Sequence, residues 1–233
     1  VTPEKLDYGK EYSLVEVQAP YGYVLDSTPV SFDVTEENST QEGGITLIKV
    51  DKPNMAQKGT ISVEKTGEVF FGVNVSGEED KDVIYQPVYK VKGLAGAVYE
   101  ITADEDVITP DGTLRYHKGD VVDTVTTNED GKAKSKELYL GKYTVVETKA
   151  PNGMVINKEK HSVELTYAGQ DVAVTETATS FVNERQKVKI SLEKILEQDE
   201  IFGIGKNNEI KNISFGLYAK EDIVSSSGTV IPA

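Results

Sequence analysis

The stretch KYTVVETKAPNGM (residues 142–154) decides the fold class of this chain, because it alternates apolar and polar residues and then ends in a turn. Alternation with a period of two is typical of a β-strand with one buried face. Tyr143, Val145 and Glu147 therefore share a face that is otherwise apolar. A carboxyl group in such a row needs a partner in the core, since burying it alone is costly.

The same pattern occurs a second time. In YSLVEVQAPYGY (residues 12–23), Glu16 occupies the position of Glu147, and an Ala-Pro-x-Gly turn follows in both segments. The two glutamates are 131 residues apart (147 − 16), which is the length of a domain rather than of a solenoid unit. We therefore predict tandem domains with one such glutamate in each.

Composition excludes several classes of function. The 233 residues carry a formal net charge of −14 without a basic cluster, which argues against nucleic acid and anionic membranes as partners. The chain has no cysteine, so disulfides, thiolate metal sites and thiol nucleophiles are excluded. We find no apolar run long enough for membrane insertion and no signal peptide, as expected of a mature fragment of a longer protein.

No metal or other cofactor is expected. The loop TTNEDGKAKSKE (126–137) resembles a calcium-binding loop in part, but Thr126 stands where the first carboxylate ligand belongs, and a hairpin turn is the better interpretation. His117 and His161 are isolated in the sequence and are interpreted as surface residues.

Short runs rich in Val, Ile, Thr and Tyr recur along the chain between turn signals such as Asp111-Gly112 and Asp130-Gly131. No segment keeps a helical period of 3.6 residues for long. The pattern predicts an all-β chain built from antiparallel β-sandwiches.

Four further apolar rows end in a charged or amide residue: Lys65, Lys194, Asn183 and Asp51. A single residue of this kind is better explained as a strand end whose side chain reaches water. The recurrence of lysine, glutamate and Asn or Asp at such positions instead indicates groups that satisfy one another in a core.

A lysine ending a first strand, the Y-x-x-x-E-x-x-A-P-x-G segment and an asparagine near the last strand resemble the Cna B-type (SpaA-like) repeats of Gram-positive surface adhesins and pilins. The resemblance covers nearly the whole chain. It implies Ig-like or prealbumin-like sandwiches and an extracellular, cell-wall-anchored location. It also implies a spontaneous isopeptide bond between Lys65 and Asn183, promoted by the acid Glu147.

The implied chemistry accounts for the buried row. Burial favours the neutral amine of Lys65, which can attack the amide of Asn183. Glu147 is expected to hydrogen-bond to the Asn183 carbonyl and to relay protons as ammonia leaves. Since the reaction occurs once per molecule, the chain modifies itself and is not an enzyme.

The repeat and the resemblance together divide the chain into one complete and two partial domains. Residues 1–52 are expected to be the C-terminal half of a domain, with Glu16 as promoter and Asp51 as acceptor. After a short linker (53–58), residues 59–185 form a complete domain with an insertion at 66–92. Residues 187–233 begin a third domain, which contains Lys194.

Three functions are compatible with the sequence. The first is a structural stalk or shaft, whose partners are neighbouring domains of the same polypeptide. The second is a ligand-binding adhesin that contacts a host matrix protein or glycan through the 66–92 insertion. The third, a glycoside hydrolase with paired carboxylates, is disfavoured because the chain has no tryptophan to line a sugar cleft and no second carboxylate at fixed spacing from the repeated glutamate.

Overall fold

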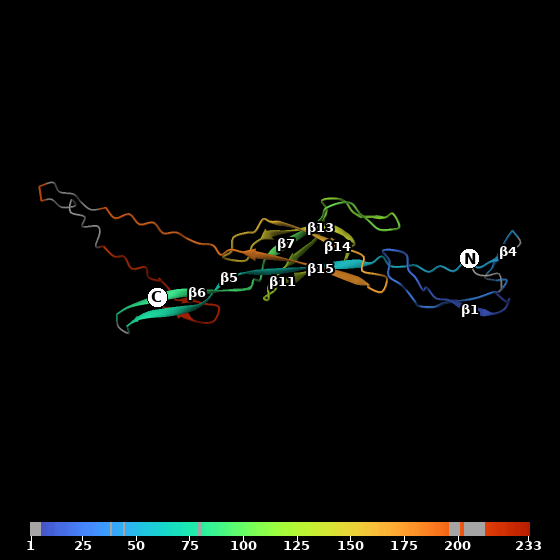
Figure 1. The fold of residues 1–233 in the computed structure, drawn as a ribbon, viewed down its shortest axis with the longest axis horizontal. Helices are drawn as coiled ribbons and strands as arrows, with labels where there is room; N and C mark the ends of the chain where they lie inside the picture. Colours follow the sequence, from blue (N-terminus) through green and yellow to red (C-terminus); the bar gives the residue numbers. More distant parts are fainter. Residues whose placement is uncertain (1–5, 38, 44, 79–80, 196–200, 203–212) are drawn as a thin grey trace.

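The computed structural model describes residues 6–37, 39–43, 45–78, 81–195, 201–202 and 213–233, and none of these residues is helical (Figure 1). The all-β expectation is therefore confirmed. A central β-sandwich occupies the middle of the molecule, while the N-terminal part and a long hairpin extend from its opposite ends (Figure 1).

The N-terminal part, here called the N-terminal unit (the described residues of 6–57), contains two small antiparallel sheets. Strand β1 (Glu11–Leu14) pairs with β2 (Val30–Asp33), and β3 (Thr40–Glu42) pairs with β4 (Ile45–Leu47). Between β4 and β5 the only strand-like pairing of the described residues is an isolated bridge of Ala56 with Tyr23, so the apolar alternation of β4 does not continue through Asp51.

The central sandwich has two layers. One sheet has the order β10-β7-β13-β14 and is antiparallel throughout: β10 (Val121–Thr126), β7 (Val98–Ala103), β13 (Gly141–Lys149) and β14 (Lys160–Leu165). The other is organised on β5 (Lys58–Glu78), which pairs with β11 (Lys132–Lys134), β12 (Leu138–Tyr139), β6 (Lys81–Gly93) and β15 (Val174–Asn183). A two-stranded sheet of β8 (Val107–Ile108) and β9 (Leu114–Tyr116) lies beside them.

Alternate residues of the two sheets form one core, as the period-two pattern predicts. Its fully buried side chains include Ile61 and Val63 from β5, Tyr99 from β7, Tyr143 from β13 and Phe181 from β15. Burying a side chain of this size stabilises the fold by roughly 1.5–3 kcal/mol. The core therefore holds the inner faces of β5, β7, β13 and β15 in fixed positions.

The first and last strands of the sandwich run parallel to each other. Strand β15 pairs with β5 over its whole length, with Phe181 opposite Lys65 and Asn183 opposite Gly67. A parallel ladder cannot be closed by a tight turn, so these neighbours are distant in sequence.

Beyond Lys65, β5 continues out of the sandwich and returns as β6, so the predicted insertion 66–92 is an antiparallel hairpin. A short C-terminal hairpin of β16 (Ile223–Val224) and β17 (Val230–Ile231) contacts it. There the backbone nitrogen of Ser226 donates to the Phe70 carbonyl at 3.0 Å.

The loop that partly resembles a calcium site is a turn but not the predicted hairpin turn, because it connects β10 in one sheet to β11 in the other. The side-chain oxygen of Asn128 accepts hydrogen bonds from the backbone nitrogens of Asp130 (3.1 Å) and Lys132 (2.9 Å). Among the described residues, no group of three or more His, Asp or Glu side chains is arranged to hold a metal ion, and no helix could cross a membrane.

Candidate cross-linking site in the central sandwich

Lys65, Glu147 and Asn183 meet inside the sandwich, although they come from three different strands. β5 supplies Lys65, β13 supplies Glu147, and β15 ends at Asn183. Their exposed fractions are 0%, 2% and 2%. Each stands at the inward phase of its strand, which is why the apolar rows of the sequence contain polar residues.

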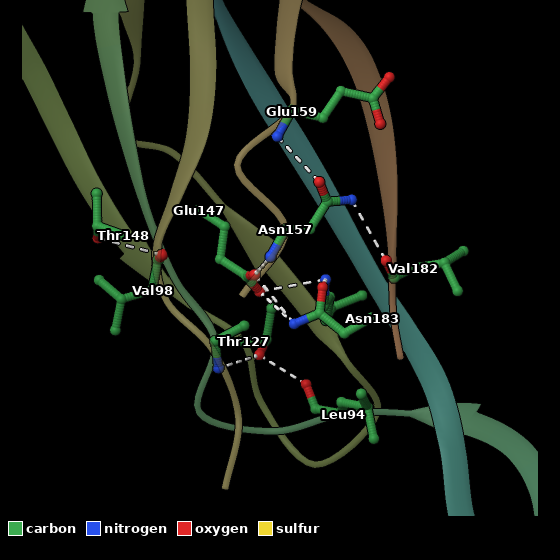
Figure 2. A network of polar contacts seen from close by, with 11 residues as sticks. Leu94, Val98, Thr127, Glu147, Thr148, Asn157, Glu159, Val182 and Asn183 are labelled. Atoms are coloured by element: carbon green, nitrogen blue, oxygen red, sulfur yellow. Dashed lines mark hydrogen bonds and ion pairs between the residues drawn. The ribbon is translucent and has the colours of Figure 1, made fainter. Parts of the chain in front are cut away.

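The three side chains form a closed set of contacts, and Figure 2 shows Glu147 with two of its partners, Asn183 and Asn157. Lys65 Nζ donates a short hydrogen bond to Asn183 Oδ1 and lies 3.2 Å from Glu147 Oε1. Asn183 Nδ2 donates to Glu147 Oε1 at 2.9 Å and to Oε2 at 3.0 Å. The backbone nitrogen of Asn157 also donates to Glu147 Oε2, at 2.6 Å, and holds the carboxylate in place.

Aromatic rings enclose this set. Tyr99 lies directly opposite Glu147 in the β7–β13 ladder, and its ring centroid is 4.8 Å from that of Phe181. Lys65 Nζ lies 6.0 Å from the Tyr99 ring centroid and 5.8 Å from the Phe181 centroid. The rings exclude water from the amine, which strengthens every electrostatic interaction within the set.

Burial lowers the pKa of Lys65, and the hydrogen bond and charge of Glu147 oppose this effect. Burial also raises the pKa of Tyr99, to which the nearby Glu147 carboxylate contributes. Tyr99 therefore stays an uncharged phenol at neutral pH. The surroundings favour a neutral lysine amine beside the Asn183 amide, which is the form able to act as a nucleophile.

One detail differs from the sequence-based expectation. Glu147 contacts the Asn183 nitrogen and not the carbonyl oxygen, which faces Lys65 instead. Glu147 Oε1 thus lies within hydrogen-bonding reach of two nitrogens: the amine of Lys65 and the amide nitrogen that would leave as ammonia. A carboxyl group in this position can accept a proton from the first and donate one to the second.

Glu16 has the same local geometry as Glu147. The backbone nitrogen of Asp26, ten residues further on, donates to Glu16 Oε2 at 3.0 Å, as that of Asn157 does for Glu147. The side chain of Asn54 donates to the same oxygen at 2.7 Å. The N-terminal unit therefore contains a glutamate and an asparagine in contact.

The expectation that Asp51 meets Glu16 is wrong. The Asp51 side chain is 80% exposed and pairs with Lys49 at 3.3 Å. The prediction extended the alternation of Ile45 and Leu47 past the end of β4, where the chain is no longer paired as a strand and even spacing no longer defines a face.

A twelve-residue sequence repeat, which is not visible from strand alternation, would have identified Asn54 as the counterpart of Asn183. NMAQKGTISVEK (54–65) and NERQKVKISLEK (183–194) are identical at seven of twelve positions, so Asn54 corresponds to Asn183 and Lys65 to Lys194. Lys194 itself lies in an exposed stretch (187–195) that the structure describes without strand pairing. It is not brought to Glu16, Asp51 or any other predicted site residue by a described contact.

Fold and site together define a class of protein: prealbumin-like β-sandwiches with a lysine, an asparagine and a glutamate in contact within the core. The family model for the SpaA prealbumin-like fold domain matches residues 1–49 and 87–179, which is more than half of the chain. The chain therefore belongs to the SpaA family of prealbumin-like domains, which confirms the resemblance seen in the sequence.

Individual relatives are more distant. The trypsin-resistant surface T6 protein of Streptococcus pyogenes serotype M6 is 29% identical over 77 residues, or 32% of this chain and 14% of that protein. The TIE protein of Bacillus anthracis is 25% identical, with a TM-score of 0.41, over 76% of this chain and 25% of that one. The major pilin SpaD of Corynebacterium diphtheriae is 20% identical, with a TM-score of 0.35, over 55% and 30%. The chain thus spans a quarter or less of the first two relatives.

Proposed function

We propose that this chain is a stalk or shaft segment of a cell-wall-anchored adhesin or pilin of a Gram-positive bacterium. We further propose that its central sandwich carries an isopeptide bond between Lys65 and Asn183, with Glu147 as the promoting acid. The observation that carries the proposal is the buried contact of these three side chains. Membership of the SpaA family and the surface and pilin names of its relatives support the location.

The reaction balances without an oxidant or cofactor. Nζ of the neutral Lys65 amine attacks the side-chain carbonyl carbon of Asn183, and Glu147 accepts one proton from Nζ. The new C–N bond forms as the bond to Nδ2 breaks, and Glu147 returns a proton so that ammonia leaves. Each chain reacts once, which makes the cross-link a modification of the protein by itself.

The cross-link suits a protein under tension. It closes a loop of 118 residues between the first and last strands of the sandwich. In the chain-entropy model, such a closure stabilises the fold by about 5 kcal/mol. Since force enters at β5 and leaves at β15, the covalent bond would bypass the strands between them and slow mechanical unfolding.

In the domain division that we propose, residues 59–185 are the complete domain, residues before it belong to a preceding one, and residues from 187 begin the next. Asn54 replaces Asp51 as the acceptor of the preceding domain, because it is the residue in contact with Glu16. Lys194 is the corresponding donor of the following domain.

Intact mass of the denatured protein tests the proposal. The wild-type chain should weigh less than its sequence by one ammonia, and Lys65→Ala or Asn183→Ala should each have its full calculated mass. A wild-type chain of full calculated mass after complete folding would rule the cross-link out.

A ligand-binding adhesin is the second candidate, and one observation favours it. The β5–β6 hairpin exposes the apolar side chains Val75 and Ile84, one on each face, and Val91 nearer the sandwich, and exposed apolar side chains can contact a host matrix protein or glycan. A screen of matrix proteins and glycans with the wild type and with Val75→Ser/Ile84→Ser tests it. Binding that is lost in the double variant supports this candidate, and no binding by the wild type excludes it.

A further inference from the structure

Gln57 lies at the junction between the N-terminal unit and the central sandwich, and it is only 1% exposed. Its Nε2 donates to the carbonyl oxygens of Gly169, at 2.8 Å, and Val172. Its Oε1 accepts from the backbone nitrogen of Ala168 at 2.8 Å. Both donor hydrogens and the acceptor of the amide are therefore satisfied by one loop of the sandwich, between β14 and β15.

The backbone of Gln57 is hydrogen-bonded to the N-terminal unit. Its nitrogen donates to the carbonyl of Gly22 at 2.8 Å, and the nitrogen of Val24 donates to the carbonyl of Met55 at 2.9 Å. One residue thus has its main chain paired within the N-terminal unit and its side chain bonded to the sandwich. Residues 53–58, expected from the sequence to be a short linker, instead form part of an interface.

The loop between β14 and β15 also contacts the N-terminal unit through Gln170. Gln170 Oε1 accepts from the backbone nitrogen of Ala19 at 2.9 Å, and its carbonyl accepts from that of Leu25, also at 2.9 Å. The ring centroids of Tyr21, from the N-terminal unit, and Tyr167, from the sandwich, lie 4.6 Å apart. The two parts therefore hold each other by reciprocal contacts.

The repeat provides an internal comparison. Gln186 is the counterpart of Gln57, and its backbone nitrogen donates to the Gly153 carbonyl at 2.8 Å, as that of Gln57 donates to the Gly22 carbonyl. Yet the Gln186 side chain is exposed. The backbone pairing therefore forms without a buried glutamine amide, so the side chain of Gln57 has a separate role.

We propose that Gln57 and Gln170 form an interdomain lock, which holds the N-terminal unit at a fixed angle to the central sandwich and transmits tension between them. A peptide linker of this length without such contacts would let the two parts rotate independently. The lock does not depend on the isopeptide bond, because no residue of the cross-linking site takes part in it.

Spin-label distances test the lock in the whole chain. Since the chain has no cysteine, Ser31→Cys and Lys160→Cys place labels specifically on exposed positions of the two parts. The distance distribution should be narrow in this background and at least twofold broader after Gln57→Ala. Gln186→Ala is the matched control and should leave it narrow. An unchanged distribution after Gln57→Ala, or equal broadening by the control, would overturn the proposal.

Amide hydrogen exchange separates loss of the lock from loss of the fold. Gln57→Ala should increase the exchange rate at Ala168 and Leu25 about tenfold or more while protection in β7 and β13 is retained. Gln57→Ala could also lose protection in β7 and β13, which would mean that the fold itself is affected. In that case Gln170→Ala tests the lock instead, because it removes only the side-chain acceptor of the Ala19 nitrogen in the β14–β15 loop. Unchanged exchange at Ala19 and Leu25 in that variant would contradict the lock.

Discussion

Lys65 and Asn183 are 118 residues apart in sequence, yet the amine of one donates to the amide oxygen of the other within the core. The contact exists because β5 and β15 pair in parallel, which places the ends of the first and last strands of the sandwich together. Glu147 reaches both from the facing sheet. Four predictions follow from this arrangement and from its partial copy in the N-terminal unit.

Replacing the promoting acid should slow the reaction without removing the fold. Glu147→Gln keeps the size of the side chain and one acceptor oxygen but cannot relay protons. The rate at which a freshly refolded chain loses the mass of ammonia should fall by roughly 10²- to 10⁴-fold. Glu164→Gln, at an exposed position of β14, is the control and should react as the wild type does. Equal rates for Glu147→Gln and wild type would show that Glu147 is not the promoter.

Loss of the cross-link should lower stability. Lys65→Ala removes a constraint worth about 5 kcal/mol on the unfolded chain, which corresponds to a fall in Tm of roughly 10–20 °C for a domain of this size. Trypsin should then cleave the central sandwich faster. Lys58→Ala, at the start of the same strand, is the control. Differential scanning calorimetry measures the change, and an identical Tm and protease half-life for Lys65→Ala would contradict a stabilising cross-link.

The unreacted chain should become more stable as pH rises. Burial lowers the pKa of Lys65 in the folded state below its ordinary value of 10.5, so between these two pKa values the unfolded chain binds more protons than the folded one. In Asn183→Ala, which cannot react, the free energy of unfolding in urea should therefore increase as the pH rises toward 10.5.

The double variant Asn183→Ala/Lys65→Met lacks the titrating amine and serves as the control for this pH dependence. Its free energy of unfolding should change less over the same interval. The same slope in both variants would show that Lys65 is not the group responsible.

The Glu16–Asn54 pair should accept a lysine supplied on a separate peptide. A synthetic KVKISLEKI (residues 187–195) contains the counterpart of Lys65 in the strand pattern of the family. Incubation with the chain should give an adduct whose mass is that of chain and peptide less one ammonia. Asn54→Ala should abolish the adduct and Asp51→Ala should not. An adduct that requires Asp51 would restore the original assignment.

Much of the site was predictable from the sequence, because the phase of a strand is a local property. Within KYTVVETKAPNGM, a period of two is enough to turn Glu147 inward, and the same reasoning applies to Lys65 and Asn183. All three are buried in the structure. The all-β class also followed from the alternation and the spacing of the turns, without knowledge of which strand pairs with which.

Alternation no longer predicts which side chains face inward once a strand ends, and the N-terminal unit is an example. Asp51 is in phase with Ile45 and Leu47 by counting, but β4 ends at Leu47, and it is Asn54 that reaches Glu16. The twelve-residue repeat that relates Asn54 to Asn183 points to the asparagine that contacts Glu16, but alternation alone does not show it.

The sequence by itself therefore determined that this is an all-β protein built on β-sandwich patterning, and which side chains of the central sandwich face inward. Only the tertiary structure decided which of them meet, that Glu147 contacts the nitrogen of Asn183 and not its oxygen, and that Gln57 bonds to a loop more than a hundred residues away. The physical reason is that the face of a strand on which a side chain lies depends only on the alternation of neighbouring residues. Contact depends instead on the register of strands and loops brought together by the packing of the whole core.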